Sequence, residues 1–539
     1  MAPRRFLLAL GGLALAAGAF AVAFVWQPGL ASVYDDSVSY LVMGQVLSPW
    51  AHASAAVVDA FPLERYPPLF PLLLGITGGA FDFRVGHALI AACFAASVFL
   101  CGVHARAVTR SNAMGIAAAL AFALLPGAWM NLKGILSEFP YLAFSLAALV
   151  QHRRLETRTD ARGWAVLAAL VCAAILTRTV GVALVAGLAA AEGLRWLRSR
   201  DARRLRAAAI ALAVPVAAIA LWYLLRPAGR EDTYAAIGAN MLKSLREEGA
   251  PWVARVILGN VDSFGYSWLR ALVIFWTGPG DPKAILASAI GLLALAGVAW
   301  RAARGEADGL YAACYLAILL FFPYPAHVYR LGLPIVPVLF AAAWWALGEA
   351  ARRISASPKR ARYAAAASFA PVALCVPAML FVAQRALAPS APGERYARAD
   401  IAEFYRFSVG PLAAATADRE IAIFEDLDRI RETTPAAARI AWSLPDYIAL
   451  LSGRTGLGVP QEADIDAFAA ALSRRRVQYL YVNAQRMREE GPAAADPLAP
   501  ARLAREYADP VWTRSGPDGK PAAALLRIDP RALEAHARP

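Results

Sequence analysis

The 539-residue chain has few charged residues for its length. Charged side chains make up 17% of it, hydrophobic side chains make up 59%, and the mean hydropathy is +0.47. A soluble protein of this size needs more polar surface to cover its core. The composition therefore excludes an ordinary soluble globular protein and predicts a membrane protein.

Cysteine and histidine are also scarce. The five cysteines lie inside apolar runs without paired spacing, which excludes a disulfide framework and favours small buried side chains. The six histidines are scattered and form no motif with metal-ligand spacing. We expect no protein metal cage, although a loosely held divalent cation is compatible with this composition.

The distribution of charge explains the net charge of +14. Residues 387–539 hold 20 Lys and Arg against 21 Asp and Glu, so the whole excess belongs to residues 1–386. A basic excess confined to the apolar part is typical of membrane topology rather than of nucleic-acid binding.

Long apolar runs indicate about eleven transmembrane helices. Runs of about 20 residues are long enough to cross the ~30 Å hydrocarbon core. The expected spans are 6–26, 86–103, 113–130, 135–150, 163–177, 179–194, 207–225, 284–300, 309–326, 331–348 and 363–383.

Arginine clusters set the expected orientation, because cytoplasmic loops collect Lys and Arg. With a cytoplasmic N-terminus, every second loop is basic. These loops hold Arg106 and Arg110; Arg153, Arg154, Arg158 and Arg162; Arg195, Arg198, Arg200, Arg203, Arg204 and Arg206; Arg301 and Arg304; and Arg352, Arg353, Lys359, Arg360 and Arg362. This register predicts a multi-pass membrane protein with a cytoplasmic N-terminus and an extracytoplasmic C-terminal region.

Some segments allow other interpretations. The spans 135–150, 163–177 and 179–194 are short and could be tilted or re-entrant. The proline-rich run Tyr66–Phe81 is placed at the interface, because counting it as a crossing would turn the later arginine clusters outward. The first run, Phe6–Trp26, has an alternative interpretation as a cleaved signal peptide.

Two domains are expected. Residues 1–386 form the transmembrane domain, whose first outer loop is 27–85, and residues 387–539 form a small extracytoplasmic α/β domain. Within the second domain, amphipathic patterns predict helices at 419–433 and 462–476. Short strands are expected at 439–442, 477–482 and 522–528.

The first outer loop contains the acidic pair Asp35 and Asp36. A carboxylate near the membrane surface can accept the proton of an attacking hydroxyl as a general base. The alternative is a helix N-cap for the apolar stretch 38–47. Either aspartate could be the base, and we favour Asp36.

Four cations lie at the expected outer surface: Arg65, Lys133, Arg178 and Arg330. A guanidinium at this depth can bind a phosphate through two hydrogen bonds, but it can also anchor the chain to lipid headgroups. Glu138 begins an apolar run, where an ionisable group usually faces a polar cavity. Its alternative role is an ion pair with Arg178.

Five short motifs occur in order along the membrane part: DSVSY at 36–40, RYPPL at 65–69, LSE at 136–138, TRTVG at 177–181 and YRLGLP at 329–334. In this series the chain resembles the GT-C glycosyltransferases, in particular the bacterial branch of aminoarabinose transferases and protein O-mannosyltransferases. The tail segment 430–456, followed by 474–482, is similar to the extracytoplasmic domain of such enzymes.

The resemblance implies a GT-C-like fold, a place in a bacterial inner membrane, and an inverting transfer from a polyprenyl-phosphate sugar to an acceptor hydroxyl of a lipid, glycan or protein. It implies Asp36, or Asp35, as the catalytic base. Arg65, Tyr66, Lys133, Arg178 and Arg330 would bind the donor phosphate, and Tyr40, Glu138 and Tyr329 would line the pocket. Many members have Asp-Glu at the start of the first motif. Alignment on Tyr40 places Asp36 and Ser37 there, whereas alignment on the acidic pair places Asp35 and Asp36 there, which leaves the role of Asp35 and of any second carboxylate undefined.

Two other functions are alternatives to a glycosyltransferase. A transporter or lipid flippase without covalent chemistry would use Glu138 and Arg178 as gating charges. However, the prominent polar residues fall at helix ends, and no repeated halves are visible. A mere membrane anchor for the tail would need one helix rather than eleven.

Overall fold

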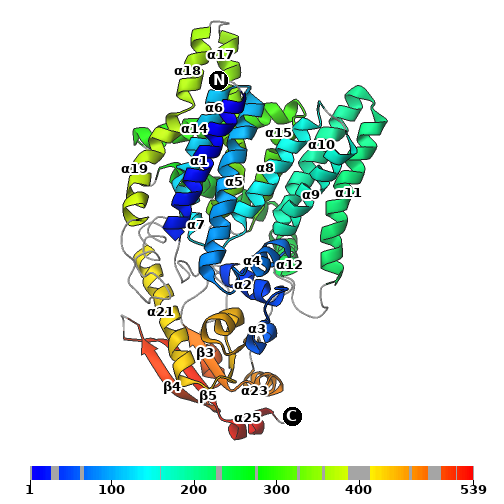
Figure 1. The fold of residues 1–539 in the computed structure, drawn as a ribbon. Coiled ribbons are helices and arrows are strands. Elements are labelled where there is room, and N and C mark those ends of the chain that lie inside the picture. The colour runs from blue at the N-terminus through cyan, green and yellow to red at the C-terminus, as the bar shows by residue number, and fades with distance from the viewer. Residues whose placement is uncertain are drawn as a thin grey trace.

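A bundle of helices and a small sheet domain at one end of it make up the computed structural model (Figure 1). It describes residues 3–25, 36–60, 66–157, 160–225, 233–273, 277–278, 280–323, 328–354, 358–386, 413–460, 464–483, 499–516 and 519–537. The polytopic helical fold with a C-terminal α/β domain is therefore confirmed. We call the end of the bundle that carries this domain the domain end.

Helix α5 occupies the centre of the bundle, where it packs against α1, α6, α8 and α17. The helices of the bundle are α1 (Pro3–Val25), α5 (Phe83–Thr109), α6 (Asn112–Ala123), α7 (Pro126–Leu132), α8 (Glu138–Arg154), α9 (Ala161–Thr177), η1 (Thr179–Gly181), α10 (Val182–Ser199), α11 (Ala202–Leu225), α14 (Pro282–Ala303), α15 (Ala307–Leu320), α16 (Val328–Leu331), η3 (Leu333–Ile335), α17 (Val336–Ile354), α18 (Pro358–Ala367) and α19 (Ala370–Ala386).

Each of the eleven expected spans coincides with one of these helices or with an adjacent set of them. Among the described residues, seven helices are long and apolar enough to cross a membrane, or eight if the bent pair α6 and α7 is one span. Helices α9 and α15 are apolar but shorter. The number eleven thus stays a prediction, whereas the membrane-spanning character is confirmed.

Five other helices in the described part of the chain are not among the candidate membrane spans. These are α2 (Asp36–Val46), α3 (Ala55–Asp59), α4 (Leu69–Thr77), α12 (Thr233–Glu248) and α13 (Ala250–Leu272). Helix α4 has only nine residues, too few to cross a bilayer, which agrees with an interfacial Tyr66–Phe81. Helices α2, α3 and α4 all lie at the domain end (Figure 1).

Glycine contacts bring α2 and α4 unusually close together. A Cβ on Gly75 would lie 2.5 Å from the carbonyl oxygen of Gly44 and 3.0 Å from the Cα of Ser48. No side chain other than hydrogen fits there, so α2 rests directly on the backbone of α4. This contact helps to set the position of α2, whose first residue is Asp36.

At the opposite end of the bundle, arginines from the basic loops are buried in ion pairs. Glu192 of α10 accepts from Arg204 at 2.7 Å and lies 2.8 Å from His152. Arg301 and Asp308 form a second buried pair at 2.6 Å. These arginines join neighbouring helices, so their place in the sequence reflects packing as well as topology.

The C-terminal domain contains one five-stranded sheet with strand order β2-β1-β3-β5-β4. Strands β1, β2 and β3 are parallel, whereas β5 is antiparallel to β3 and β4. Its elements are α21 (Ala413–Thr433), β1 (Arg439–Ala441), α22 (Pro445–Tyr447), η5 (Ile448–Ser452), β2 (Thr455–Leu457), α23 (Ile465–Arg474), β3 (Tyr479–Asn483), α24 (Ala499–Leu503), β4 (Ala508–Ser515), β5 (Pro521–Ile528) and α25 (Pro530–Ala537).

All five elements expected in this domain are present with shifted ends, while β2 and β4 were not expected. Helix α21 is held to the sheet by Asp426, which accepts from Arg514 at 2.7 Å and from the Tyr481 hydroxyl at 2.7 Å. The domain contacts the first outer loop through α22, η5 and β2. The proposed boundary near residue 387 falls outside the described residues.

Candidate active site

Residues from five separate segments meet at the domain end of the bundle. The segments are the first turn of α2, the residue Tyr66 before α4, the start of α8, the junction between α9 and η1, and α16. All five are helix ends or short turns. Helices α8, α9 and α17 support the segments that carry the charged side chains: α8 packs against α9 and η3, and η3 also contacts α17.

Asp36 is the first residue of α2, and both of its carboxylate oxygens accept hydrogen bonds from distant segments. The Tyr66 hydroxyl donates to Oδ1 at 2.5 Å, and Nη2 of Arg330 donates to Oδ2. The Asp36 carboxylate therefore joins α2 to α16 and to Tyr66, which lies shortly before α4. This is not the arrangement of a helix N-cap, in which the side-chain oxygen accepts from a backbone N–H in the first turn of the same helix.

The surroundings of Asp36 favour its ionised form. Burial raises the pKa of this carboxyl, but the charge of Arg330, the hydrogen bond from Tyr66 and the charge of Arg178 outweigh burial and leave the pKa below its usual range. Asp36 is thus a carboxylate at neutral pH.

Glu138 occupies the centre of the cluster. Its Oε1 lies 2.7 Å from Nη1 of Arg178 and 3.0 Å from Nε of Arg330, and the side chain is 1% exposed. The ion pair with Arg178, which was the alternative role for Glu138, is therefore present. Glu138 also reaches Arg330, so one buried carboxylate aligns both arginines beside Asp36.

Hydroxyl groups extend this network. Ser137 accepts from Nη1 of Arg178 at 2.9 Å, and its Oγ lies 2.8 Å from the Tyr40 hydroxyl. The rings of Tyr40 and Tyr66 are in contact, with centroids 4.6 Å apart. Tyr40 and Tyr66 therefore form one aromatic wall beside the charged groups.

Among the residues that the structure describes, the cluster contains two carboxylates and two guanidiniums, whose charges balance. An incoming phosphate could replace a carboxylate on a guanidinium, since both anions accept two parallel hydrogen bonds from arginine. The same exchange would release a carboxylate to act as a base. The arrangement can thus bind an anion and accept a proton within one small space.

Two of the expected site residues lie against other parts of the fold. Lys133 donates to the carbonyl of Phe24 at 3.4 Å, and its Nζ is 4.0 Å from the centroid of the Phe24 ring. Its described contacts are thus with α1. The Tyr329 hydroxyl contacts the sulfur of Met130 at 3.3 Å.

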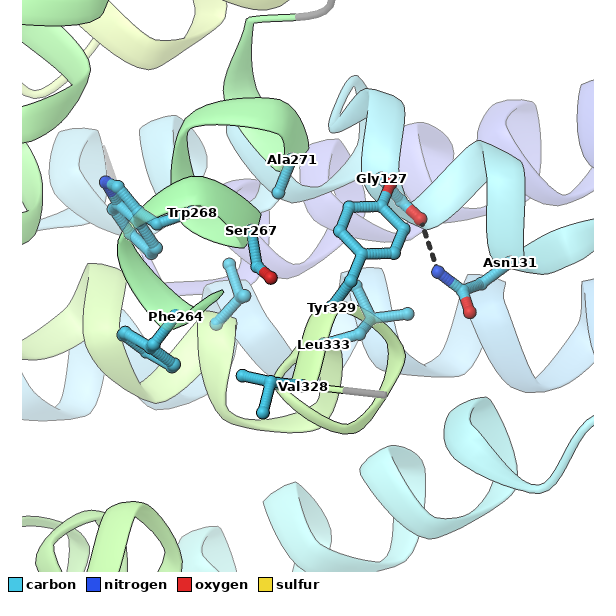
Figure 2. A pocket seen from close by; sticks show the side chains of 11 residues that line it. Gly127, Asn131, Phe264, Ser267, Trp268, Ala271, Val328, Tyr329 and Leu333 are labelled. Atoms are coloured by element: carbon cyan, nitrogen blue, oxygen red, sulfur yellow. Dashed lines mark hydrogen bonds between the residues drawn. The ribbon is translucent and has the colours of Figure 1, made fainter. Parts of the chain in front are cut away.

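Tyr329 lines a small, mostly apolar pocket with residues of α7, α13 and η3, as Figure 2 shows. Gly127, Asn131, Ser267 and Trp268 are among the other residues that line it. Neither Asp36, Glu138, Arg178 nor Arg330 is among them. Arg330 and Tyr329 are adjacent in α16, so this helix presents one side chain to the charged cluster and the next to the pocket.

Asp35 and Arg65 lie outside the described residues. Of the candidates that the structure describes, it brings together Asp36, Tyr40, Tyr66, Glu138, Arg178 and Arg330.

Ser137, which belongs to the cluster, was not among the expected site residues, and neither was Arg270, a buried arginine for which no contact with the cluster is described. Ser137 had a local signal, since it precedes Glu138 in one of the motifs. Arg270 of α13 is 8% exposed, stacks on the Tyr266 ring at 5.2 Å, and has no hydrogen-bond partner for Nη1 among the described residues. Nothing in its local sequence distinguishes it from a surface arginine of an amphipathic helix.

The described part of the chain contains no group of three His, Cys, Asp or Glu residues that could hold a metal ion. The two buried acids of the cluster are both paired with arginine. The expectation that the protein has no metal cage stays a prediction.

Comparisons with known proteins identify the fold. No sequence-family model and no curated protein matches the chain. Among solved structures, the oligosaccharyltransferase of Archaeoglobus fulgidus in complex with zinc and sulfate is similar with TM-score 0.51 and 14% identity, over 97% of this chain and 76% of that one. ArnT from Cupriavidus metallidurans in the apo state is similar with TM-score 0.50 and 16% identity, over 100% of both chains. The chain therefore shares its fold with these two structures.

Proposed function

We propose that the chain is a membrane glycosyltransferase, which moves a sugar from a polyprenyl-phosphate donor to an acceptor hydroxyl on the extracytoplasmic side. The observation that carries this proposal is the contact of Asp36 with Arg330 beside the Glu138–Arg178 pair. It combines a proton acceptor with phosphate-binding cations, which are the two functions that the reaction needs.

The reaction is a single displacement with inversion. The acceptor oxygen attacks the anomeric carbon, the bond from that carbon to the phosphate oxygen breaks, and polyprenyl phosphate leaves with the electron pair. Asp36 accepts the proton of the acceptor hydroxyl. Arg330 and Arg178 stabilise the charge that develops on the leaving phosphate.

The contact between Arg330 and Asp36 gives the donor a second role in this mechanism. Asp36 is a weak base while Arg330 lowers its pKa. When the donor phosphate binds Arg330, that arginine interacts less with Asp36, and the carboxylate becomes more basic. The base is thus strengthened only when the donor is present.

A transporter or flippase is the second candidate. It would place its charged residues along a pathway through the middle of the membrane. The Asp36 cluster instead lies at helix ends on the domain end of the bundle, next to the sheet domain (Figure 1). This location favours chemistry at a membrane surface.

The test uses purified protein in lipid nanodiscs with a panel of polyprenyl-phosphate hexoses and pentoses and candidate lipid, glycan and peptide acceptors. Release of polyprenyl phosphate and transfer of labelled sugar are both measured. Mass analysis of envelope lipids and glycans from cells with and without the gene identifies which sugar and acceptor to include. We expect turnover with at least one pair.

The variant Asp36→Asn keeps the side-chain shape but cannot accept the proton. We expect kcat to fall on the order of 10²- to 10⁴-fold. The matched control is Asp59→Asn, which neutralises a 48% exposed carboxylate of α3 at the same end of the molecule, and it should keep full activity. Full activity of Asp36→Asn would remove Asp36 as the base, and labelled lipid crossing the bilayer without covalent turnover would favour the flippase.

A further inference from the structure

The helix that carries Asp36 is also bonded directly to the C-terminal domain. Ser39, one turn after Asp36 on α2, donates from Oγ to Oδ2 of Asp446 at 2.5 Å. The two residues are 407 positions apart in sequence, and they are 0% and 2% exposed. A buried carboxylate of the sheet domain is therefore bonded to the helix that begins with Asp36.

We propose that Asp446 is a positioning residue, which holds α2 at the rotation that directs Asp36 toward Arg330 and Tyr66. The proposal rests on the proposed function, because it assigns Asp446 a part in that same reaction. Asp446 acts through Ser39 and the backbone of α2 rather than by contact with the substrate.

The sheet sets the place of Asp446 in the domain. Pro445 begins the short helix α22, and Asp446 follows it. Strand β2 lies so close to this turn that a Cβ on Gly456 would be 1.9 Å from the carbonyl oxygen of Pro445. Because β2 is paired in register with β1, the sheet supports this turn. The position of Asp446 is therefore fixed relative to the strands.

Helix geometry connects this bond to Asp36. Residues three apart on a helix lie on neighbouring positions of one face, so fixing Ser39 restricts the rotation of α2 at Asp36. Asp36 is the first described residue of α2 and lies one helical turn before Ser39. A hydrogen bond to a buried carboxylate is among the stronger ones, which suits it for this task.

A second contact between the two regions offers a matched control. Arg439 of β1 lies 3.8 Å from Asp59 of α3, and both side chains are partly exposed, at 35% and 48%. An ion pair of this kind contributes little. The Arg439–Asp59 pair joins the same two regions through α3 rather than α2. Removing this pair therefore tests whether any weakening of the interface between the regions lowers activity.

The experiment compares Asp446→Leu, Asp446→Asn and Ser39→Ala with Asp59→Asn, in full-length protein in nanodiscs. Leucine has a similar size but accepts no hydrogen bond, whereas asparagine retains an acceptor oxygen. We expect Asp446→Leu and Ser39→Ala to lower kcat on the order of 10- to 100-fold through misplacement of the base. The donor KM should change little, and Asp446→Asn and Asp59→Asn should stay close to the wild type.

Two readouts separate positioning from mere stability. The acid limb of the pH–rate profile should move to higher pH in Asp446→Leu, since Asp36 loses its alignment with Arg330. In the double variant Ser39→Ala/Asp446→Leu, kcat should fall no further than in either single variant, because one bond is lost in all three. A lower melting temperature with unchanged kcat and pH profile would overturn the proposal.

Hydrogen exchange of residues 36–46 gives a readout that needs no turnover. We expect their amide exchange to accelerate in Asp446→Leu and to remain unchanged in Asp59→Asn. Should the wild type show no sugar transfer, the proposed function fails, while faster exchange would still show that Asp446 holds α2. Unchanged exchange in Asp446→Leu would overturn the positioning role whatever the activity.

Discussion

At the scale of single residues, Asp36 depends on its neighbours for its charge state. Burial raises its pKa, and Arg330, Tyr66 and Arg178 lower it, with the net result below the ordinary value of 3.8. Asp36 is therefore fully ionised at neutral pH, and this basic form is lost only as the pH falls through the lowered pKa. Between neutral pH and about pH 5, the ionisation of Asp36 should leave kcat/KM unchanged.

The variant Arg330→Gln should move this acid limb to higher pH. Without the positive charge of Arg330, the effect of burial is less opposed, and the pKa of Asp36 rises. The measurement is kcat/KM against pH for the wild type and the variant, with the donor below its KM. An acid limb at the same pH in both proteins would show that the Asp36–Arg330 contact does not control the base.

Replacement of Glu138 should destabilise the protein. Glu138→Gln leaves Arg178 and Arg330 with an uncharged partner in a buried place, and loss of one member of a buried ion pair costs about 3 to 5 kcal/mol. Thermal unfolding in detergent measures the loss. The control is Glu349→Gln, whose partners Arg352 and Arg353 are 60% and 58% exposed; a surface pair of this kind should change stability by less than about 1 kcal/mol.

At the scale of elements, the crossing of α2 and α4 determines where Asp36 lies. In Gly75→Ala the new Cβ would meet the backbone of Gly44 at 2.5 Å, so one of the two helices must move. We expect a loss of about 1 to 3 kcal/mol in stability together with a lower kcat, because Asp36 moves with α2.

Gly193→Ala is the matched control for this prediction. Gly193 also lies within a helix, α10, but a Cβ there meets nothing within 4 Å. Alanine should therefore be neutral or stabilising at this position. Equal effects of the two substitutions on kcat would contradict a special role for the α2–α4 crossing.

At the scale of the whole molecule, orientation in the membrane is the main prediction. The basic loops predict that the C-terminal domain is extracytoplasmic. Exposed serines on the two sides can report this: Ser515 lies in β4, and Ser199 ends α10 at the opposite end of the bundle. In intact cells, a membrane-impermeant maleimide should label Ser515→Cys and should label Ser199→Cys only after permeabilisation.

The parent protein, with its five native cysteines, is the background control for this labelling. The opposite labelling pattern would show that the chain has the inverted topology. It would also place the Asp36 cluster on the cytoplasmic side, where the proposed donor and acceptor would have to be sought instead.

Periodicity and local composition by themselves determined the helices of the bundle and the α/β character of the tail. A run of about 20 apolar residues has few alternatives to a membrane helix, since unpaired backbone groups are costly in lipid. The site was partly predictable for the same reason: ionisable residues at the ends of apolar runs, such as Glu138 and Arg178, are expensive there and stand out.

Only the tertiary structure decided which of these charged residues meet. Lys133 and Arg178 look alike in sequence, yet the first lies against Phe24 and the second pairs with Glu138. The bond from Ser39 to Asp446 spans 407 positions, and no local pattern records such a separation. Contacts of this kind depend on how helices and domains pack against one another, which one segment of sequence does not contain.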